Sequence, residues 1–247
     1  MHRQTKQMLE QGIIEPAKCS GWASPVVMHR KSNGNYRFCI DFRRLNRVTK
    51  PDAYPSTFMQ DILRKLRQAR YISTIDLGSA YHQVPLTKSS RPLTAFTVPG
   101  LGLFQFRRMP FGLSNACATF QRLIDKILAS ALQPSAFAYL DDIVIASRSW
   151  EEHKSHLRLV LERLREAGLT INRKKCNFCK PEVRYLGVLV NKNGFRPDPA
   201  KIAPIMEYPA PKNLKQLRRY LGMASWTHQE GPEIRVECRA RKSSGTT

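Results

Sequence analysis

The chain has 247 residues, 42% of them hydrophobic, so we expect one compact unit with subdomains instead of several independent domains. Lysine and arginine number 41 against 19 acidic residues, and the formal net charge of +22 predicts a polyanionic partner, first of all nucleic acid. A membrane surface is the competing partner, but no basic helix has the long apolar face needed and no apolar run could span a bilayer. Six cysteines without a secretory signal predict a reducing, intracellular setting, either the cytoplasm or the nucleus.

Helices and short strands interleave in the first half of the chain. The predicted elements are a polar helix over 3–11, a hairpin of strands 25–28 and 36–40 around a basic turn, a helix over 58–66, a strand over 71–76 and a hairpin within 94–107. The strand at 71–76 ends in a carboxylate, Asp76.

The second half continues the alternation. The predicted elements are a helix capped by Ser114 and ended by Pro134, strands over 136–140 and 143–146, a helix over 150–167, a strand over 185–190, a helix opened by Pro197 and Pro199, and a helix over 214–223. From Thr227 the apolar period is lost, which predicts a disordered tail over 227–247. Hairpins mixed with helices predict an α+β fold with helices on one face of an antiparallel sheet.

Asp141 and Asp142 stand together between the two apolar strands at 136–140 and 143–146. Adjacent carboxylates raise each other's pKa, so an ionised pair at this position calls for a counter-charge such as a divalent metal. A solvated hairpin turn is the alternative, because Asp is common in turns. Asp76 supplies a third strand-end carboxylate, although alone it could be a helix cap or an ordinary strand-end acid. Three such carboxylates on a basic chain predict metal-dependent phosphoryl transfer on nucleotides.

Four blocks of sequence resemble the reverse transcriptases of gypsy-type long-terminal-repeat retrotransposons. They are YRFCIDFRRLN at 36–46, IDLGSAYHQV at 75–84, MPFGLSNA at 109–116 and YLDD at 139–142, followed by GL at 168–169, KKC at 174–176 and YLG at 185–187. Seven blocks in order from about residue 12 to residue 226 make the resemblance specific. It implies a right-hand polymerase fold and an RNA-directed DNA polymerase that extends a primer on an RNA or DNA template with deoxynucleoside triphosphates.

The resemblance also implies roles for individual residues. Asp76, Asp141, Asp142 and the Leu77 carbonyl would bind two Mg²⁺ ions, for which Mn²⁺ could substitute, and Lys175 would protonate pyrophosphate. Arg30 or Lys31, with Arg37, would grip the triphosphate, while Ser79, Ala80, Tyr81 and Phe111 would line the nucleotide pocket. Tyr81 would exclude a ribose 2′-hydroxyl, and Tyr139, Leu186 and Gly187 would position the primer.

Plainer explanations exist for several of these residues. Arg30 and Lys31 could belong to a solvated turn, Tyr81 could be an ordinary core tyrosine, and Lys175 a surface lysine. A separate set, His153, His156, Cys176 and Cys179, has spacing that zinc accepts. A solvated helix face for the two histidines and partial burial of the two cysteines explain that set more simply.

The resemblance implies a division of the chain into polymerase regions. Residues 1–189 would form fingers (about 12–48 and 77–109) and palm (about 49–76 and 110–189), and 190–226 would begin the thumb. The loss of resemblance after Trp226 predicts a truncated element copy with weak or distributive synthesis. The alternatives are a catalytically inactive remnant that binds nucleic acid and, disfavoured by Tyr81, an RNA-dependent RNA polymerase.

Overall fold

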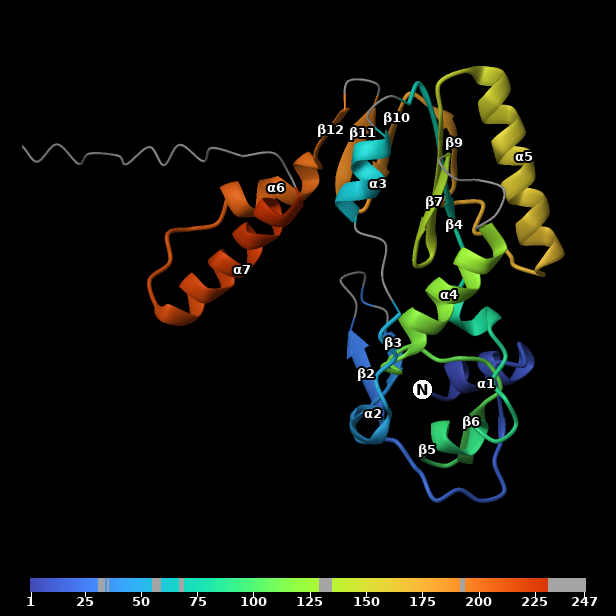
Figure 1. The fold of residues 1–247 in the computed structure, drawn as a ribbon. Helices are drawn as coiled ribbons and strands as arrows, with labels where there is room; N and C mark the ends of the chain where they lie inside the picture. The colour runs from blue at the N-terminus through green and yellow to red at the C-terminus, as the bar shows by residue number, and fades with distance from the viewer. Residues whose placement is uncertain are drawn as a thin grey trace, which may run out of the picture.

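The computed structural model describes residues 1–30, 34, 36–54, 59–66, 69–128, 135–191 and 194–230. Its elements are α1 (His2–Glu10), β1 (Ile14–Pro16), β2 (Val26–Arg30), β3 (Tyr36–Ile40), α2 (Arg43–Val48), α3 (Met59–Leu66), β4 (Tyr71–Asp76), the 3₁₀ turns η1 (Ala80–Gln83) and η2 (Arg91–Thr94), β5 (Phe96–Val98), β6 (Gly102–Phe106), α4 (Ala116–Leu128), β7 (Ala136–Tyr139), β8 (Asp142–Ser147), α5 (Trp150–Glu166), β9 (Asn177–Lys180), β10 (Glu182–Tyr185), β11 (Val188–Asn191), β12 (Gly194–Pro197), α6 (Pro199–Met206) and α7 (Leu214–Glu230) (Figure 1). The predicted α+β class is confirmed.

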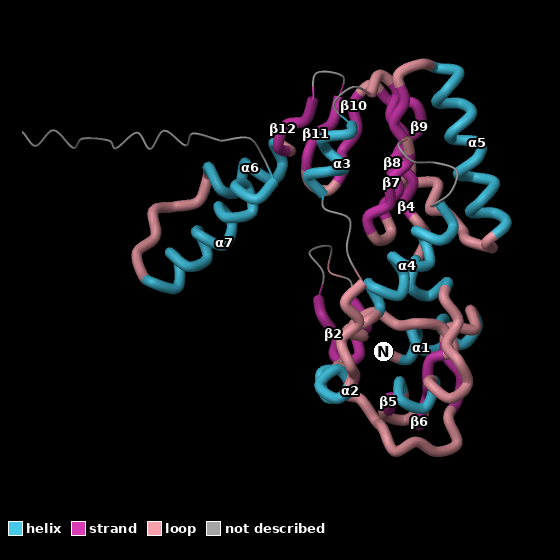
Figure 2. The backbone as a smooth tube through the Cα atoms, viewed as in Figure 1, coloured by secondary structure: helices cyan, strands magenta, loops and turns pink. Residues whose placement is uncertain are grey.

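A four-stranded antiparallel sheet, in the order β7-β8-β4-β9, forms the centre of the upper part of the molecule (Figure 2). Because side chains alternate along a strand, β8 sends Ile143 and Ile145 to one face and Val144 and Ala146 to the other. The first face packs against α4 and α5. The second packs against α3 and the β10–β11 hairpin, so the prediction that helices cover one face only is wrong. Both faces are apolar, and both need a cover.

The lower part of the molecule contains the sheet β1-β6-β5 and the β2–β3 hairpin, around a core that includes Phe42, Phe96, Phe104 and Phe106. All four rings are at most 5% exposed. The predicted hairpins at 25–40 and 94–107 are therefore confirmed.

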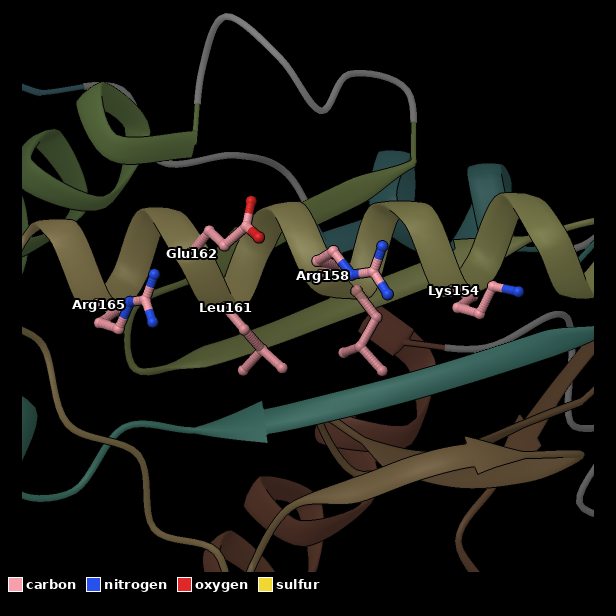
Figure 3. A pocket seen from close by; sticks show the side chains of 6 residues that line it. Lys154, Arg158, Leu161, Glu162 and Arg165 are labelled. Carbon is pink, nitrogen blue, oxygen red and sulfur yellow. The ribbon is translucent and has the colours of Figure 1, made fainter.

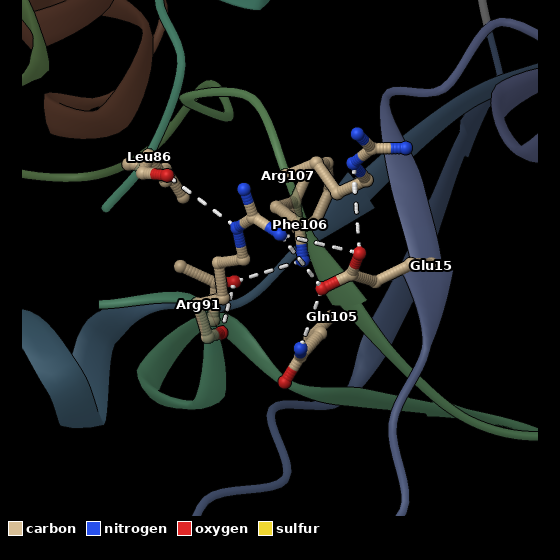
Figure 4. A network of polar contacts seen from close by, with 7 residues as sticks. Glu15, Leu86, Arg91, Gln105, Phe106 and Arg107 are labelled. Atoms are coloured by element: carbon tan, nitrogen blue, oxygen red, sulfur yellow. Dashed lines mark hydrogen bonds and ion pairs between the residues drawn. The ribbon is translucent and has the colours of Figure 1, made fainter. Parts of the chain in front are cut away.

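A polar cluster around the carboxylate of Glu15 braces this lower part (Figure 4). Gln105 Nε2 donates to Glu15 Oε1 at 2.8 Å, and the guanidinium groups of Arg91 and Arg107 lie at 3.3 and 3.5 Å. Burial raises the pKa of Glu15, but the hydrogen bonds from Gln105 and Arg91 and the two positive charges outweigh it, so the pKa is lowered. The cluster joins β1, β6 and η2 and is held most firmly when Glu15 is ionised.

Two predicted boundaries in this part of the chain are wrong. The strand expected over 185–190 is two strands, β10 and β11, separated by a turn at Leu186 and Gly187 with φ of +49° and +87°. Helix α4 begins at Ala116, and the side chain of Asn115 before it binds Lys50 and Asp52 instead of capping. These contacts lie far away in sequence, so local pattern does not reveal them.

Helices α6 and α7 pair with each other, with the rings of Tyr208 and Tyr220 5.8 Å apart, and extend to one side of the molecule (Figure 1). Helix α7 continues through Glu230, so the predicted loss of structure at Thr227 is wrong for 227–230; the rest of the predicted tail lies outside the described residues. Within the described chain, every helix is too short or too polar to cross a bilayer.

Candidate active site

The two adjacent aspartates lie at the tip of the β7–β8 hairpin. Tyr139 pairs with Asp142 across the hairpin, so the turn consists of Leu140 and Asp141, and Asp142 already opens β8. Leu140 has φ of +56°, a left-handed conformation that is costly for a residue with a Cβ. The expectation that both aspartates form the turn is therefore wrong by one residue. The tight turn places the half-buried Asp141 beyond the strands, where it lines a cavity, while Asp142 stays in the sheet.

Gln121 of α4 holds this turn in place. Its Oε1 accepts from the Leu140 N–H at 2.8 Å, and its Nε2 donates to the Ala138 carbonyl at 3.1 Å and to Asp125 Oδ1 at 2.9 Å. Tyr54 donates to the other oxygen of Asp125 at 2.8 Å. Gln121 is only 4% exposed, and a buried amide must use its hydrogen-bonding groups. In the sequence, Gln121 is a polar residue on the apolar face of a predicted helix. That position could have indicated a buried hydrogen-bonding role, which the sequence prediction missed.

Asp76 meets the pair through strand register. β4 and β8 are antiparallel, with Asp76 directly opposite Asp142, and the Leu77 N–H donates to the Asp141 carbonyl at 3.1 Å. Burial raises the pKa of Asp142, and the neighbouring charges of Asp141 and Asp76 raise it further, against a smaller lowering by Lys175. The structure thus brings the three predicted carboxylates to the same end of the two central strands, β4 and β8.

Lys175 supplies the local positive charge. Its Nζ donates to Asp76 Oδ2 at 3.1 Å. The loop that carries it is fixed by the Asn172 N–H, which donates to the Asp76 carbonyl at 2.8 Å. The side chain of Lys175 is 64% exposed, so it can leave Asp76 without losing a buried contact.

A cavity of about 640 Å³ opens beside these carboxylates. Residues from the lower and upper parts of the molecule line it: Met8, Phe38, Cys39, Ile40, Asp76, Leu77, Ser79, Ala80, His82, Phe106, Pro110, Phe111, Gly112, Asp141, Asn172 and Lys175. The predicted pocket residues Ser79, Ala80 and Phe111 are among them. Met8, Cys39 and His82 were missed, because nothing local in the sequence places them near Asp76.

Tyr81 lies behind this lining, because its ring contacts Phe111, which lines the cavity, and Tyr81 itself is not a lining residue. Its ring packs edge-on between Phe111 (4.8 Å between centroids) and Phe120 (5.5 Å), and its hydroxyl lies 3.2 Å from the Cys117 Sγ. Burial is the main cause of its raised pKa, followed by Cys117 and then the charge of Asp141. Tyr81 therefore supports the cavity wall and lies within electrostatic range of the carboxylates.

The predicted triphosphate residues are only partly described. Arg30 ends β2 with an exposed side chain and does not line the cavity. Arg37 lies in β3 opposite His29, with its side chain outside the described part, and Lys31 lies outside the described residues. The choice between Arg30 and Lys31 stays a prediction.

The predicted primer residues lie on the other side of the carboxylates. Tyr139 and Leu186 pack against the same apolar cluster, and Gly187 completes the turn between β10 and β11. The hydroxyl of Tyr185 donates to the Asp142 carbonyl at 3.5 Å, which ties this turn to β8. The arrangement places this half-buried turn next to the Asp pair.

The histidines of the zinc-like set have another role. His153 is fully buried, with Nε2 2.8 Å from Ser73 Oγ and Nδ1 3.2 Å from Ser147 Oγ, so the prediction of a solvated face is wrong for it. His156 Nδ1 also lies 3.2 Å from Ser147 Oγ, while the two cysteines are partly buried as predicted. Among the described residues, no three His, Cys, Asp or Glu side chains are already close enough to cage a metal ion.

A second hollow, of about 370 Å³, runs along α5 and is lined by Lys154, Leu157, Arg158, Leu161, Glu162 and Arg165 (Figure 3). All six residues come from one helix, and none is a predicted site residue. The carboxylate cavity is therefore the candidate active site.

Comparison with known proteins agrees with this geometry. Residues 29–190 match the model of the family described as reverse transcriptase (RNA-dependent DNA polymerase). The chain is 39% identical over 232 residues to the retrovirus-related Pol polyprotein from transposon gypsy of Drosophila melanogaster, covering 92% of this chain and 22% of that protein. The chain thus spans about a fifth of the length of this curated relative.

Two solved structures of the foamy viral protease-reverse transcriptase are similar in fold. The complex with dsDNA matches with a TM-score of 0.84 and 28% identity, over 92% of this chain and 47% of that chain. The complex with an RNA/DNA hybrid matches with a TM-score of 0.82 and 28% identity, over 91% of this chain and 30% of that chain. The right-hand polymerase fold is confirmed, and the chain belongs to the reverse transcriptase (RNA-dependent DNA polymerase) family, with the gypsy-type resemblance confirmed.

Proposed function

We propose that this chain catalyses template-directed transfer of deoxynucleotides to a primer 3′-hydroxyl. The single observation that carries the proposal is the register of β4 with β8, which sets Asp76 opposite Asp142 with Asp141 at the adjoining turn. Asp76 and Asp141 line an accessible cavity, and Asp142 lies opposite Asp76 in the neighbouring strand. Carboxylates in this arrangement are what phosphoryl transfer on a nucleotide needs.

The donor set fits divalent magnesium, because carboxylate and carbonyl oxygens are its preferred protein ligands. Asp76, Asp141, Asp142 and the Leu77 carbonyl would hold two ions, and Mn²⁺ could replace Mg²⁺. When bound, the ions activate the primer hydroxyl and neutralise charge on the leaving pyrophosphate. The raised pKa of Asp142 supports this assignment, because a cation would offset the repulsion that raises it.

The chain's own groups would do the rest. Lys175 bonds Asp76 at 3.1 Å with an exposed amine, so it can transfer this contact to the pyrophosphate and donate a proton there. Arg30 or Lys31, with Arg37, would bind the triphosphate from the β2–β3 hairpin. Phe111, supported by Tyr81, would border the sugar and reject a 2′-hydroxyl.

A primer–template duplex is the partner that the charge and the family support. The net charge is +22, and phosphate neutralisation by such a surface supplies affinity without sequence preference. The matched foamy viral structures hold dsDNA and an RNA/DNA hybrid. We assign β2–β3 and the lower body to fingers, the four-stranded sheet with its covers to palm, and α6 and α7 to the thumb region.

Primer extension on an RNA template tests the proposal. The unmodified chain should add deoxynucleotides only with Mg²⁺ or Mn²⁺, and Asp141→Asn should lose the activity. Glu162→Gln, an exposed change on α5, is the control and should extend normally. Tight duplex binding with no extension by the unmodified chain would instead support the inactive nucleic-acid-binding alternative.

A further inference from the structure

We propose that Cys117 is a positioning residue that sets how strongly the site discriminates deoxyribose from ribose. The inference deepens the proposed function and rests on it. Cys117 would act through Tyr81 and Phe111 and would not touch the nucleotide. No feature of the sequence had assigned this cysteine a role.

The contact that carries the inference joins α4 to η1. The hydroxyl of Tyr81 lies 3.2 Å from the Sγ of Cys117, and within the described part of the chain it is the only hydrogen bond of that hydroxyl. Cys117 is the second residue of α4 and is exposed, whereas Tyr81 is 8% exposed. A nearly buried hydroxyl is therefore fixed by a thiol at the surface.

The ring of Tyr81 transmits this position to the cavity. It is held edge-on between Phe120, which is fully buried, and Phe111, which is 53% exposed and lines the cavity. Phe120 cannot yield without opening a void in the core. Phe111 also contacts His82, with ring centroids 5.4 Å apart, but it is the less buried neighbour of Tyr81, so a shift of Tyr81 toward the cavity would move Phe111 before Phe120.

Sugar discrimination depends on the position of this wall. Asp76 and Phe111 line the same cavity, so a nucleotide with its phosphates at the carboxylates would extend its sugar toward Phe111. Discrimination by exclusion requires a wall that does not retreat when a 2′-hydroxyl presses on it. The bond from Tyr81 to Cys117 resists that retreat from behind.

The test compares Cys117→Ala with Cys117→Ser. Alanine removes the partner of the Tyr81 hydroxyl while suiting a helix, and serine restores a group that can donate and accept. Cys19→Ser is the matched control, because Cys19 is an exposed free cysteine that does not border the cavity. Thermal unfolding should show that all three variants are folded.

Two quantities are measured for dGTP and GTP with Mg²⁺ on a primer–template: the ratio of equilibrium Kd values and the ratio of incorporation efficiencies. Cys117→Ala should narrow both ratios by about threefold to tenfold, the range expected for one hydrogen bond. Cys117→Ser and Cys19→Ser should stay within about twofold of the unmodified chain.

Unchanged ratios in Cys117→Ala, or equal narrowing in Cys117→Ser, would overturn the inference, since the thiol would then only fill space. Absence of incorporation by the unmodified chain would count against the proposed function alone, because the Kd ratio still decides the role of Cys117. Equal Kd values for the two nucleotides in the unmodified chain would also overturn the inference.

Discussion

Replacing Gln121 with methionine tests the idea that one buried amide holds the carboxylate turn. Methionine matches glutamine in length but removes the bonds to Leu140, Ala138 and Asp125. The Leu140 N–H and the Ala138 carbonyl would lose their partner, at about 1 to 3 kcal/mol for each group that stays buried. Because Leu140 is partly exposed, we expect a total loss of about 2 to 4 kcal/mol.

Activity should fall further than stability implies. Leu140 in the left-handed region costs roughly 1 to 2 kcal/mol, and the bond from Gln121 offsets that cost. Without the bond the turn can relax and move Asp141. A displacement of about 1 Å in a catalytic group can cost on the order of a hundredfold in rate.

The assays are urea unfolding and thermal unfolding, both followed by circular dichroism, and primer extension. A loss of this size should lower the Tm by roughly 5 to 15 °C in a chain of this length. Gln105→Met is the control. Gln105 donates one hydrogen bond to Glu15, and in this variant the Glu15 carboxylate would still have its ion pairs with Arg91 and Arg107. We expect it to cost under about 1.5 kcal/mol and to leave extension normal. If Gln121→Met were no less stable than Gln105→Met and extended primers equally well, Gln121 would not hold the turn.

Three further predictions follow from the same contacts. Asp142→Asn should raise the unfolding free energy by about 1 kcal/mol in metal-free buffer at neutral pH, because burial and the charges of Asp141 and Asp76 disfavour the ionised carboxylate. The same variant should reduce primer extension, and a lower unfolding free energy would contradict the reasoning. The pKa of His153 is lowered, first by burial and then by His156, so the unfolded chain takes up the proton more readily; stability should fall as pH drops below the ordinary value of 6.5, and urea curves at pH 7.5 and 5.5 should differ less in His153→Gln. Parallel pH dependences in the two proteins would exclude this assignment. Tyr54→Phe removes only the far end of the Gln121 network and should cost about 0.5 to 1.5 kcal/mol, with a smaller loss of extension than Gln121→Met. An equal loss of activity would show that the bond from Tyr54 to Asp125 matters as much as the bonds of Gln121.

Much of the local structure could be predicted from the sequence. The strand Tyr71–Asp76 was predicted with its bounds, because its apolar run ends in a carboxylate and its neighbours are turn residues. The 150–167 helix was predicted within one residue of α5, because apolar spacing and a serine cap act over single turns. These signals lie within one segment of the sequence, so they can be read without knowing which other segments pack against it.

The missed features depend on contacts between distant segments. His153 was assigned to solvent because its neighbours in the helix are polar, yet Ser73 and Ser147 from two strands enclose it. Cys39 and Met8 border the cavity only because the lower part of the molecule lies against the carboxylate edge. The packing of Tyr81 between Phe111 and Phe120 likewise comes from segments distant in the sequence, and its expected contact with the nucleotide stays a prediction.

The sequence by itself determined the chemistry, because the carboxylates, their spacing and the positive charge are properties of composition and order. Only the tertiary structure decided how that chemistry is held in place. The register of β4 with β8 brings Asp76 to Asp142, and Gln121 fixes Leu140 in its costly conformation. Both depend on hydrogen bonds between residues far apart in the chain, and no local pattern encodes such pairing.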